Sequence, residues 1–280
     1  MEVFETAVAL AEFVQSERAV GKTIGFVPTM GALHTGHISL VKEALRVCDC
    51  CVVSVFVNPT QFNDPKDLET YPRTFEADAA MLAAVGADAV LHPSVKEIYP
   101  QEDKRIFEVG AVAEVMEGMH RPGHFNGVMQ VVSRLFDIVR PDKAFFGEKD
   151  FQQVAVIRAM CQLIGSPVKV ISCPIVREPD GLAMSSRNVR LTPDQRIKAP
   201  YIYKTLEQSL GYAKEHTPAE TISWVVAQID AEEGLRVEYF SLVDTDSLQS
   251  IEAWTDSDHV QGCITVFCGE VRLIDNIAYK

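Results

Sequence analysis

The chain of 280 residues is 47% hydrophobic and 23% charged, and its formal net charge is -13 at pH 7. This length can bury a sizeable core without disulfides or metals, and the acidic balance argues against a duplex nucleic-acid binder, which needs a dominant basic face. The longest apolar stretch, residues 50–59, is too short to span a bilayer, and the first residues carry acids where a signal peptide carries bases. We therefore expect a folded cytoplasmic protein whose seven cysteines are reduced thiols.

The first part of the chain alternates short apolar runs with helical patterns. Helical patterns begin near Gly36, Thr74, Asn126 and Asp150. The apolar runs between them predict strands at residues 23–30, 51–59, 87–93, 143–147 and 168–176. This order, with strands that are almost continuously apolar, predicts an α/β fold: a Rossmann-like, doubly wound parallel sheet with helices on both faces.

The pattern changes after Val176. Residues 192–195 and 217–220 each combine an N-cap threonine, a proline at the first helical position and a Gln or Glu that completes a capping box. Two helices therefore begin there, and the β-rich segments 236–244 and 263–275 follow as strands of a small sheet.

These patterns predict two domains. Residues 1–176 form the Rossmann-like domain, which we expect to bind the ligands, and residues 177–280 form a smaller C-terminal α+β domain that acts as a lid. A turn and a polar run make residues 177–190 a mobile loop between them.

The segment "PTMGALHTGH", residues 28–37, follows the first predicted strand, at the edge where parallel sheets collect ligands. Gly31 permits a sharp turn, and Gly36 removes a side chain where a ligand could approach the backbone. The helix that follows directs its N-terminus at the same spot, and His34 and His37 lie on one face of its first turn, so the stretch is suited to nucleotide phosphates. The alternative is that one histidine caps the helix and the other packs.

Two later motifs fall at the same edge of the sheet. "GEKD", residues 147–150, offers Lys149 as a positive charge, and Asp150 could instead cap the next helix through a box with Gln153. "AMSSRN", residues 183–188, offers two hydroxyls and the guanidinium of Arg187, which matches phosphate geometry, although alone it would be an ordinary polar loop.

H-x-G-H after the first strand and M-S-S-R after the fifth resemble the superfamily of nucleotidyltransferases and class I aminoacyl-tRNA synthetases. Within it, "PTMGALHTGH", "NPTQF", "YPRT", "RPGHFNGV", "FFGEKDFQQ" and "DGLAMSSRN" occur in an order that resembles the pantothenate synthetases, the pantoate and beta-alanine ligases. The resemblance implies ATP-dependent condensation of (R)-pantoate with beta-alanine to pantothenate, AMP and pyrophosphate, through a pantoyl adenylate. It also implies magnesium as the ATP counter-ion and a homodimer.

The resemblance further implies the site residues. ATP would be bound by Met30, Gly31, Ala32, Leu33, His34, Thr35, Gly36, His37, Gly147, Glu148, Lys149, Asp150, Val176 (through its backbone), Met184, Ser185, Ser186 and Arg187. Of these, the catalytic group would be His34, His37, Lys149, Ser185, Ser186 and Arg187. Gln61 and Gln153 would hold pantoate, and Gln61 would also contact beta-alanine.

Other positions stay open. Asp150, Glu76 and Asp78 are candidate magnesium ligands, with a solvated helix face as the alternative for the last two. The base for the beta-alanine amine could be His124, the AMP phosphate or water. Departures from the family pattern stand at Asn126, Met129, Gln130 and Arg134 and in the loop of residues 63–74.

Three other functions compete with the ligase. An adenylyltransferase of the same superfamily would need a basic pocket for a phosphorylated acceptor, whereas Gln61 and Gln153 suit an uncharged polyol acid. A noncatalytic nucleotide-binding module would tolerate loss of His37, Lys149 or the "SSR" loop, and all are present. The acidic charge disfavours a tRNA-acting synthetase.

Overall fold

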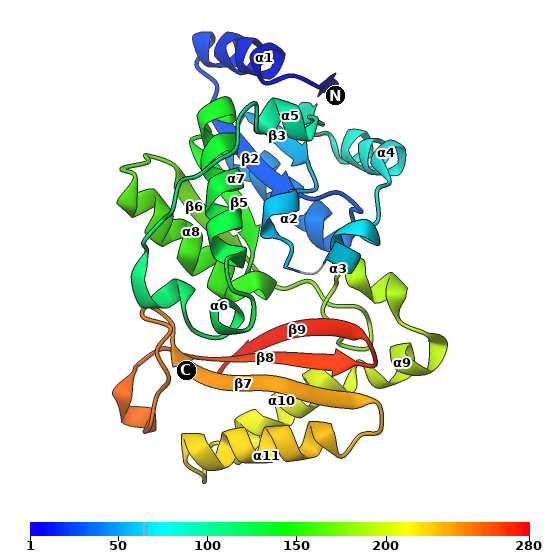
Figure 1. Ribbon diagram of the computed structural model, residues 1–280, viewed down its shortest axis with the longest axis vertical. Coiled ribbons are helices and arrows are strands. Elements are labelled where there is room, and N and C mark those ends of the chain that lie inside the picture. The colour runs from blue at the N-terminus through cyan, green and yellow to red at the C-terminus, as the bar shows by residue number, and fades with distance from the viewer. Residues whose placement is uncertain (64) are drawn as a thin grey trace.

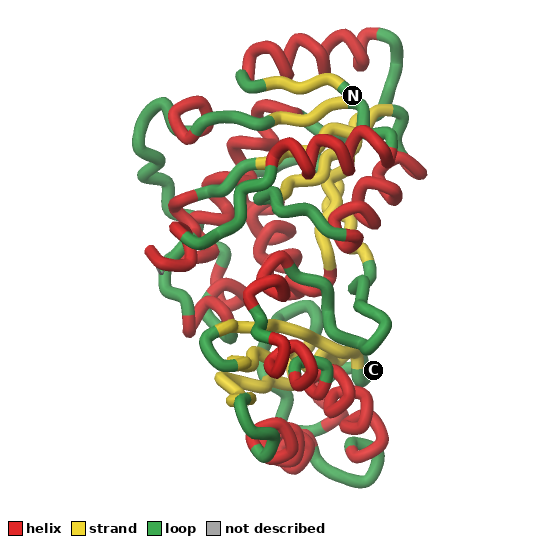
Figure 2. Tube along the Cα trace, turned by 90° about the vertical axis from the view of Figure 1, so that its right-hand side faces the viewer, coloured by secondary structure: helices red, strands yellow, loops and turns green. Residues whose placement is uncertain are grey.

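The computed structural model describes residues 1–63 and 65–280, so residue 64, in the loop of residues 63–74, lies outside it. The molecule has two sheets, one above the other in Figures 1 and 2, with helices above, beside and below them. The strands are β1 (Glu2–Phe4), β2 (Ile24–Thr29), β3 (Cys50–Val55), β4 (Ala89–Leu91), β5 (Lys143–Gly147), β6 (Lys169–Cys173), β7 (Leu235–Asp244), β8 (Val260–Cys268) and β9 (Val271–Ala278). The α-helices are α1 (Ala7–Ala19), α2 (Thr35–Val47), α3 (Pro65–Glu69), α4 (Phe75–Val85), α5 (Val95–Ile98), α6 (Glu117–His120), α7 (His124–Val139), α8 (Phe151–Leu163), α9 (Pro193–Lys198), α10 (Tyr201–Tyr212) and α11 (Pro218–Asp230).

The larger sheet has the strand order β1-β4-β3-β2-β5-β6, and all its pairs are parallel. Phe26 of β2 pairs with Val52 on one side and Ala144 on the other, so β2 is central. The chain runs outward from β2 in both directions, through β3 and β4 on one side and β5 and β6 on the other. The gap between the carboxyl ends of β2 and β5 is therefore the switch point where open α/β sheets bind ligands.

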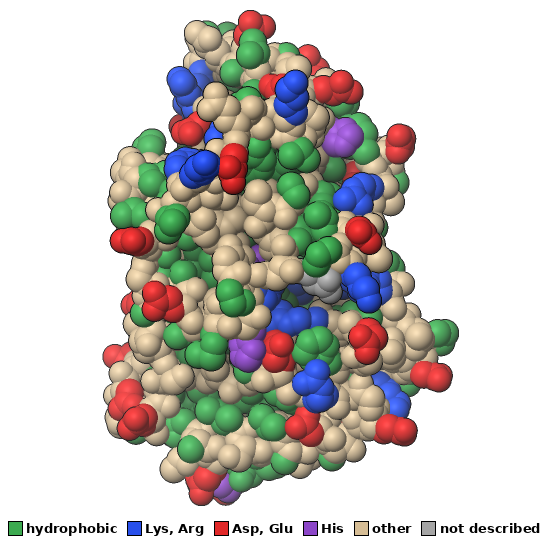
Figure 3. All heavy atoms as spheres, viewed as in Figure 1, with side chains coloured by type: hydrophobic (Ala, Val, Ile, Leu, Met, Phe, Trp, Pro, Cys, Tyr) green, Lys and Arg blue, Asp and Glu red, His purple; other side chains and the backbone are tan. Residues whose placement is uncertain are grey.

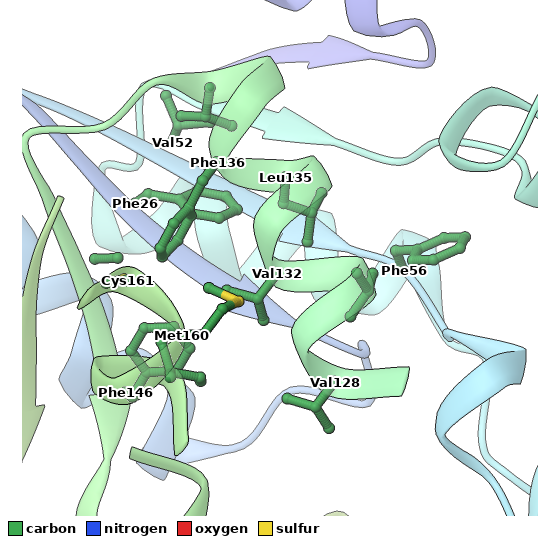
Figure 4. Packing of buried hydrophobic residues seen from close by; sticks show 14 of the residues in the cluster. Phe26, Val52, Phe56, Val128, Val132, Leu135, Phe136, Phe146, Met160 and Cys161 are labelled. Carbon is green, nitrogen blue, oxygen red and sulfur yellow. The ribbon is translucent and has the colours of Figure 1, made fainter. Parts of the chain in front are cut away.

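Consecutive residues of the central strands enter two different cores, because side chains alternate across a strand. Phe26 and Val52 pack with α1, α7 and α8, whereas Val27 and Val53 pack with α2 and α4 on the opposite face. Figure 4 shows the first core, where α7 presents Val128, Val132, Leu135 and Phe136. Covering both faces explains why these strands are apolar at nearly every position.

The smaller sheet is antiparallel, in the order β7-β8-β9. One face packs on α10 and α11 through a core that includes Leu206, Val225 and Ile264. On the other face, Cys263 and Tyr239 contact Met116 and neighbouring residues of the first part of the chain. Both predicted capping boxes, at Thr192 and Thr217, are present, and the predicted fold class is confirmed.

Several expectations differ in detail from the structure. The helix α1 was not predicted, and the segment 263–275, expected as one strand, holds most of β8, the turn after it and the start of β9. The sequence analysis missed β1, a three-residue edge strand too short for its pattern to be recognised. The predicted strand 51–59 ends at Val55, because residues 59–61 turn into a 3₁₀ helix capped by the Asn58 side chain. All seven cysteines lie in the described residues; six are buried and Cys48 is partly exposed, and burial raises the pKa of every one.

Candidate active site

A cavity of about 210 Å³ opens at the carboxyl ends of β2 and β5. Figure 3 shows that the surface is hollowed between the two sheets and that Lys and Arg side chains gather there. Its lining includes most of the predicted site residues: Met30, His34, Gly36, His37, Gln61, Gly147, Lys149, Asp150, Gln153, Val176, Met184, Ser185, Ser186 and Arg187. Gly31, Ala32, Leu33, Thr35 and Glu148 lie outside this lining.

The loop after β2 is held from behind by Asp78 of α4. Its two carboxylate oxygens accept hydrogen bonds from the backbone N–H groups of Ala32 (2.9 Å) and Leu33 (2.8 Å), and the residue is 2% exposed. Gly31 and Ala32 have φ of +81° and +49°, so this carboxylate stabilises a turn of left-handed residues. Asp78 is therefore a structural anchor, and neither interpretation left open for it, a magnesium ligand or a solvated helix face, describes it. Glu76 lies on the exposed face of the same helix, as the alternative interpretation held.

His34 and His37 cap α2 reciprocally. The Nδ1 atom of His34 accepts from the backbone N–H of Gly36 (3.1 Å), and that of His37 accepts from the backbone N–H of His34 (3.3 Å). Both rings also line the cavity, with centroids 4.1 Å apart. Capping and facing a ligand are therefore not exclusive: each ring uses Nδ1 for the helix and has Nε2 for the cavity.

Burial sets the charge of both imidazoles, and these hydrogen bonds set their tautomer. Burial lowers the pKa of His34 to about 4 and that of His37 to about 3, with the positive charge of Lys149 contributing to both. Both rings are thus neutral near pH 7, and because Nδ1 accepts, the proton lies on Nε2. The pair offers two N–H donors but no positive charge.

Gly36 is required by the first histidine. A Cβ atom there would lie 2.9 Å from the His34 ring, so any side chain would displace the imidazole from its capping position. The sequence analysis assigned this glycine to the approach of a ligand. In the structure the close contact is with His34, while Met184 closes over the same turn through a contact between its sulfur and the Thr35 hydroxyl.

Lys149 and Asp150 follow β5 in a short 3₁₀ turn. Asp150 is the N-cap residue of α8, but its side chain makes no capping hydrogen bond to any described residue, so the capping box with Gln153, one of the two interpretations left open, is not formed. Both side chains face the cavity instead, and the Asp150 carboxylate lies 3.8 Å from the Lys149 ammonium.

The segment after Met184 closes the opposite wall. Arg187 donates to Asp67 of α3 at 2.7 Å, and Arg190 pairs with the other oxygen of the same carboxylate at 2.8 Å. Ser185 caps the 3₁₀ turn through Arg187 N–H (3.2 Å). Arg187 thus lines the cavity with its charge already paired.

The two predicted pantoate glutamines also meet at the cavity. Buried Asn58 donates its amide to Gln61 Oε1 (3.1 Å) and orients that side chain. His124 lies behind Gln61: its Nδ1 is 2.8 Å from the Gln61 carbonyl and its Nε2 3.1 Å from an Arg121 nitrogen. Since a carbonyl only accepts and a guanidinium only donates, His124 is neutral with its lone pair occupied, and burial lowers its pKa to about 4.

The four residues of α7 that depart from the family pattern serve the fold and not the cavity. Asn126 and Gln130 bond the backbone of residues 103–107, and Arg134 pairs with Asp103 at 3.0 Å. Met129 is 1% exposed in the core. All four lie outside the lining of the cavity, so they fasten a connecting segment to α7 and leave the site as it is.

Sequence reasoning missed Asn58, Asp67 and Asp78 as supports of the site. Asn58 stands in the motif "NPTQF", directly after the apolar pair Phe56–Val57, and its position before a Pro was the available signal for a capping side chain. Asp67 and Asp78 gave no comparable signal, because their partners are 120 and about 46 residues away.

The doubly wound sheet and the cavity at its switch point place the protein in the class of Rossmann-like α/β proteins that bind ligands at the carboxyl ends of their strands. The sequence model of the family described as Pantoate-beta-alanine ligase matches residues 2–278. The chain therefore belongs to the pantoate-beta-alanine ligase family, and it is a ligase.

Individual relatives agree over the whole chain. It is 62% identical over 280 residues to a pantothenate synthetase of Porphyromonas gingivalis, with 100% of both chains covered. It superposes on the crystal structure of the Thermus thermophilus pantothenate synthetase with a TM-score of 0.93 at 40% identity, covering 100% of this chain and 99% of the other. The pantoate-beta-alanine ligase of Francisella tularensis, solved with beta-gamma ATP and beta-alanine, gives 0.79 at 34% identity, with 100% and 98% covered.

The described residues hold no group of three or more His, Cys, Asp or Glu side chains suited to a metal ion. Across that same part of the chain, every helix is too short or too polar to cross a membrane.

Proposed function

We propose that this ligase, which joins pantoate to beta-alanine, works in two steps through pantoyl adenylate. The observation that carries the proposal is the cavity itself. It gathers the N-terminus of α2 with two neutral imidazole donors, the Lys149 ammonium and two glutamine amides, which is the donor set that a triphosphate beside a hydroxy acid requires.

In the first step a pantoate carboxylate oxygen attacks the α-phosphorus of ATP, and the bond to the bridging oxygen breaks to release pyrophosphate. The Nε2–H groups of His34 and His37 donate to phosphate oxygens as charge shifts onto them, and Lys149 neutralises the leaving group. Gln61 and Gln153 hold pantoate through neutral amides, which leaves its carboxylate nucleophilic.

In the second step the beta-alanine amine attacks the acyl carbon of the adenylate, the bond from that carbon to the phosphate oxygen breaks, and AMP leaves. The amine must lose a proton. His124 is unsuited to accept it, since both ring nitrogens are engaged, so the proton goes to the AMP phosphate or to water. Positioning supplies the rest of the catalysis, because no protein nucleophile is needed.

The proposal also covers the metal ion, the cellular location, the oligomeric state and the roles of the two domains. Magnesium, as the counter-ion of ATP, would be held chiefly by phosphates and water, and Asp150, which alone of the three candidate carboxylates lines the cavity, would be its protein ligand. We propose a cytoplasmic homodimer, with residues 1–176 binding ATP and pantoate and residues 177–280 acting as a lid over them.

The test follows pyrophosphate release from ATP and Mg²⁺ with pantoate, with and without beta-alanine. Pantoate labelled with ¹⁸O in its carboxylate should transfer one label to AMP, because one of its oxygens becomes the bridge to phosphorus. We expect pantoate-dependent pyrophosphate, and labelled AMP with pantothenate only when beta-alanine is added. Pyrophosphate release that is independent of pantoate, or unlabelled AMP, would instead favour an adenylyltransferase with another acceptor.

A further inference from the structure

The Lys149 backbone is fastened by a residue of the small C-terminal sheet. Asn276 of β9 donates one side-chain N–H to the carbonyl of Glu148 at 2.9 Å and another to that of Lys149 at 3.1 Å. Both amide hydrogens of Asn276 are therefore committed to two consecutive carbonyls beside the cavity. The side chain comes from a strand more than 120 residues later in the chain.

Asn276 is itself held from two sides. Its Oδ1 accepts from Gln261 Nε2 of β8 at 2.7 Å, and its backbone N–H donates to Asp275 at 2.8 Å. Asp275 in turn receives both arms of the Arg177 guanidinium, at 2.7 and 2.9 Å. Asn276 is 3% exposed and Asp275 6% exposed, so water competes little for these bonds.

Arg177, the first residue of this series of contacts, lies where the chain passes from the larger sheet to the smaller one. Arg177 directly follows Val176, which lines the cavity, and it begins the segment 177–190. The contacts run from Arg177 through Asp275 and Asn276 to Lys149, so they join the connection between the two sheets to a residue of the site.

We propose that Asn276 is a positioning residue, which fixes the backbone of Lys149 so that its ammonium points into the ATP cavity. A shift of about 1 Å in a group that binds charge at the reacting centre costs roughly tenfold to one hundredfold in rate. The packing of the small sheet against the first part of the chain thereby positions Lys149 for ATP. This inference rests on the proposed role of Lys149 toward ATP.

The test is a double-substitution cycle on the full chain. Asn276→Ala should lower kcat/KM for ATP about tenfold in the pantoate-dependent pyrophosphate assay, and leave KM for pantoate within twofold. In the Lys149→Ala background the same substitution should cost less than about twofold, measured in single turnovers with enzyme in excess, because residues that act through one group are not additive. A role confined to folding would lower the melting temperature and reduce activity equally in both backgrounds.

Tyr279→Phe is the matched control. It removes the hydroxyl that Tyr279 shares with buried Ser209, close to Asn276 along the chain but away from the cavity. It should lower the melting temperature with kcat/KM for ATP unchanged. If Asn276→Ala does not fold, Asn276→Ser keeps a smaller donor and is measured in its place.

The results separate the two hypotheses. Equal losses from the Asn276 substitution with and without Lys149, or an unchanged kcat/KM for ATP, would overturn the positioning role. Absence of pantoate-dependent pyrophosphate from the unsubstituted protein would instead overturn the proposed function.

Discussion

Asp78→Ala should destabilise the protein by about 3 kcal/mol and weaken ATP binding. Hydrogen bonds to a charged group contribute roughly 1.5 to 3 kcal/mol each, so the two bonds to Ala32 and Leu33 would sum to about 6 kcal/mol at most. Asp78 and Gly31 also border a second cavity, of about 250 Å³, and we expect water to enter from it once the carboxylate is removed. Because water can then hydrogen-bond to these donors, we expect the free energy of unfolding to fall by about half of that sum.

The assay is urea unfolding at pH 7, with KM for ATP measured in parallel. Asp78→Asn keeps one acceptor oxygen and should lose about half as much stability as the alanine variant. KM for ATP should rise in the same order, because the loop leads directly into the His34 cap. Glu76→Ala is the control on the exposed face of α4, and it should stay within about 0.5 kcal/mol of the parent. An Asp78→Ala variant as stable as Glu76→Ala would refute the anchoring role.

Three further predictions concern the histidines and the glutamine. His37→Ala should lower kcat about one hundredfold or more, since one transition-state donor contributes roughly 3 kcal/mol, and an unchanged kcat in the pyrophosphate assay would remove His37 from the mechanism. Gln153→Ala should raise KM for pantoate and spare KM for ATP in steady-state kinetics; an effect confined to ATP would show that the glutamine is misassigned. Acid should destabilise the fold: the folded pKa values of His34, His37 and His124, about 4, 3 and 4, lie below the unfolded value near 6.5, so stability is lost as pH falls from 6.5 toward 4. Each contributes up to about 1.4 kcal/mol per pH unit, and His124→Gln should flatten the dependence of unfolding free energy on pH between 6.5 and 5; an identical slope would contradict it.

The parallel sheet was predictable because each central strand is buried on both faces and is therefore apolar at nearly every position. The helix starts at Thr192 and Thr217 were equally accessible, since a capping box is a local interaction between residues three apart. The small edge strand β1 was not, because three residues cannot display a period.

Within the site, the residues that face the ligand were easier to predict than the residues that hold them in place. His34, His37 and Lys149 stood in recognisable motifs, and the structure brings them to one cavity. The role of the Asp78 carboxylate stayed open between a metal ligand and a solvated helix face, because its real partners, two backbone N–H groups, have no signature in a sequence. For Asp150 a cap and a site residue stayed equally open, because spacing alone does not show in which direction a side chain points.

The burial of the cysteines makes the protein convenient to label. With six thiols inside and only Cys48 partly accessible, maleimide dyes would find little native competition. Val189, 80% exposed within the segment 177–190, and Val20, 73% exposed after α1, are natural places to introduce one cysteine each. A fluorophore pair at these positions would show, molecule by molecule, whether the segment 177–190 moves relative to α1 when ATP enters, with all seven original cysteines left in place.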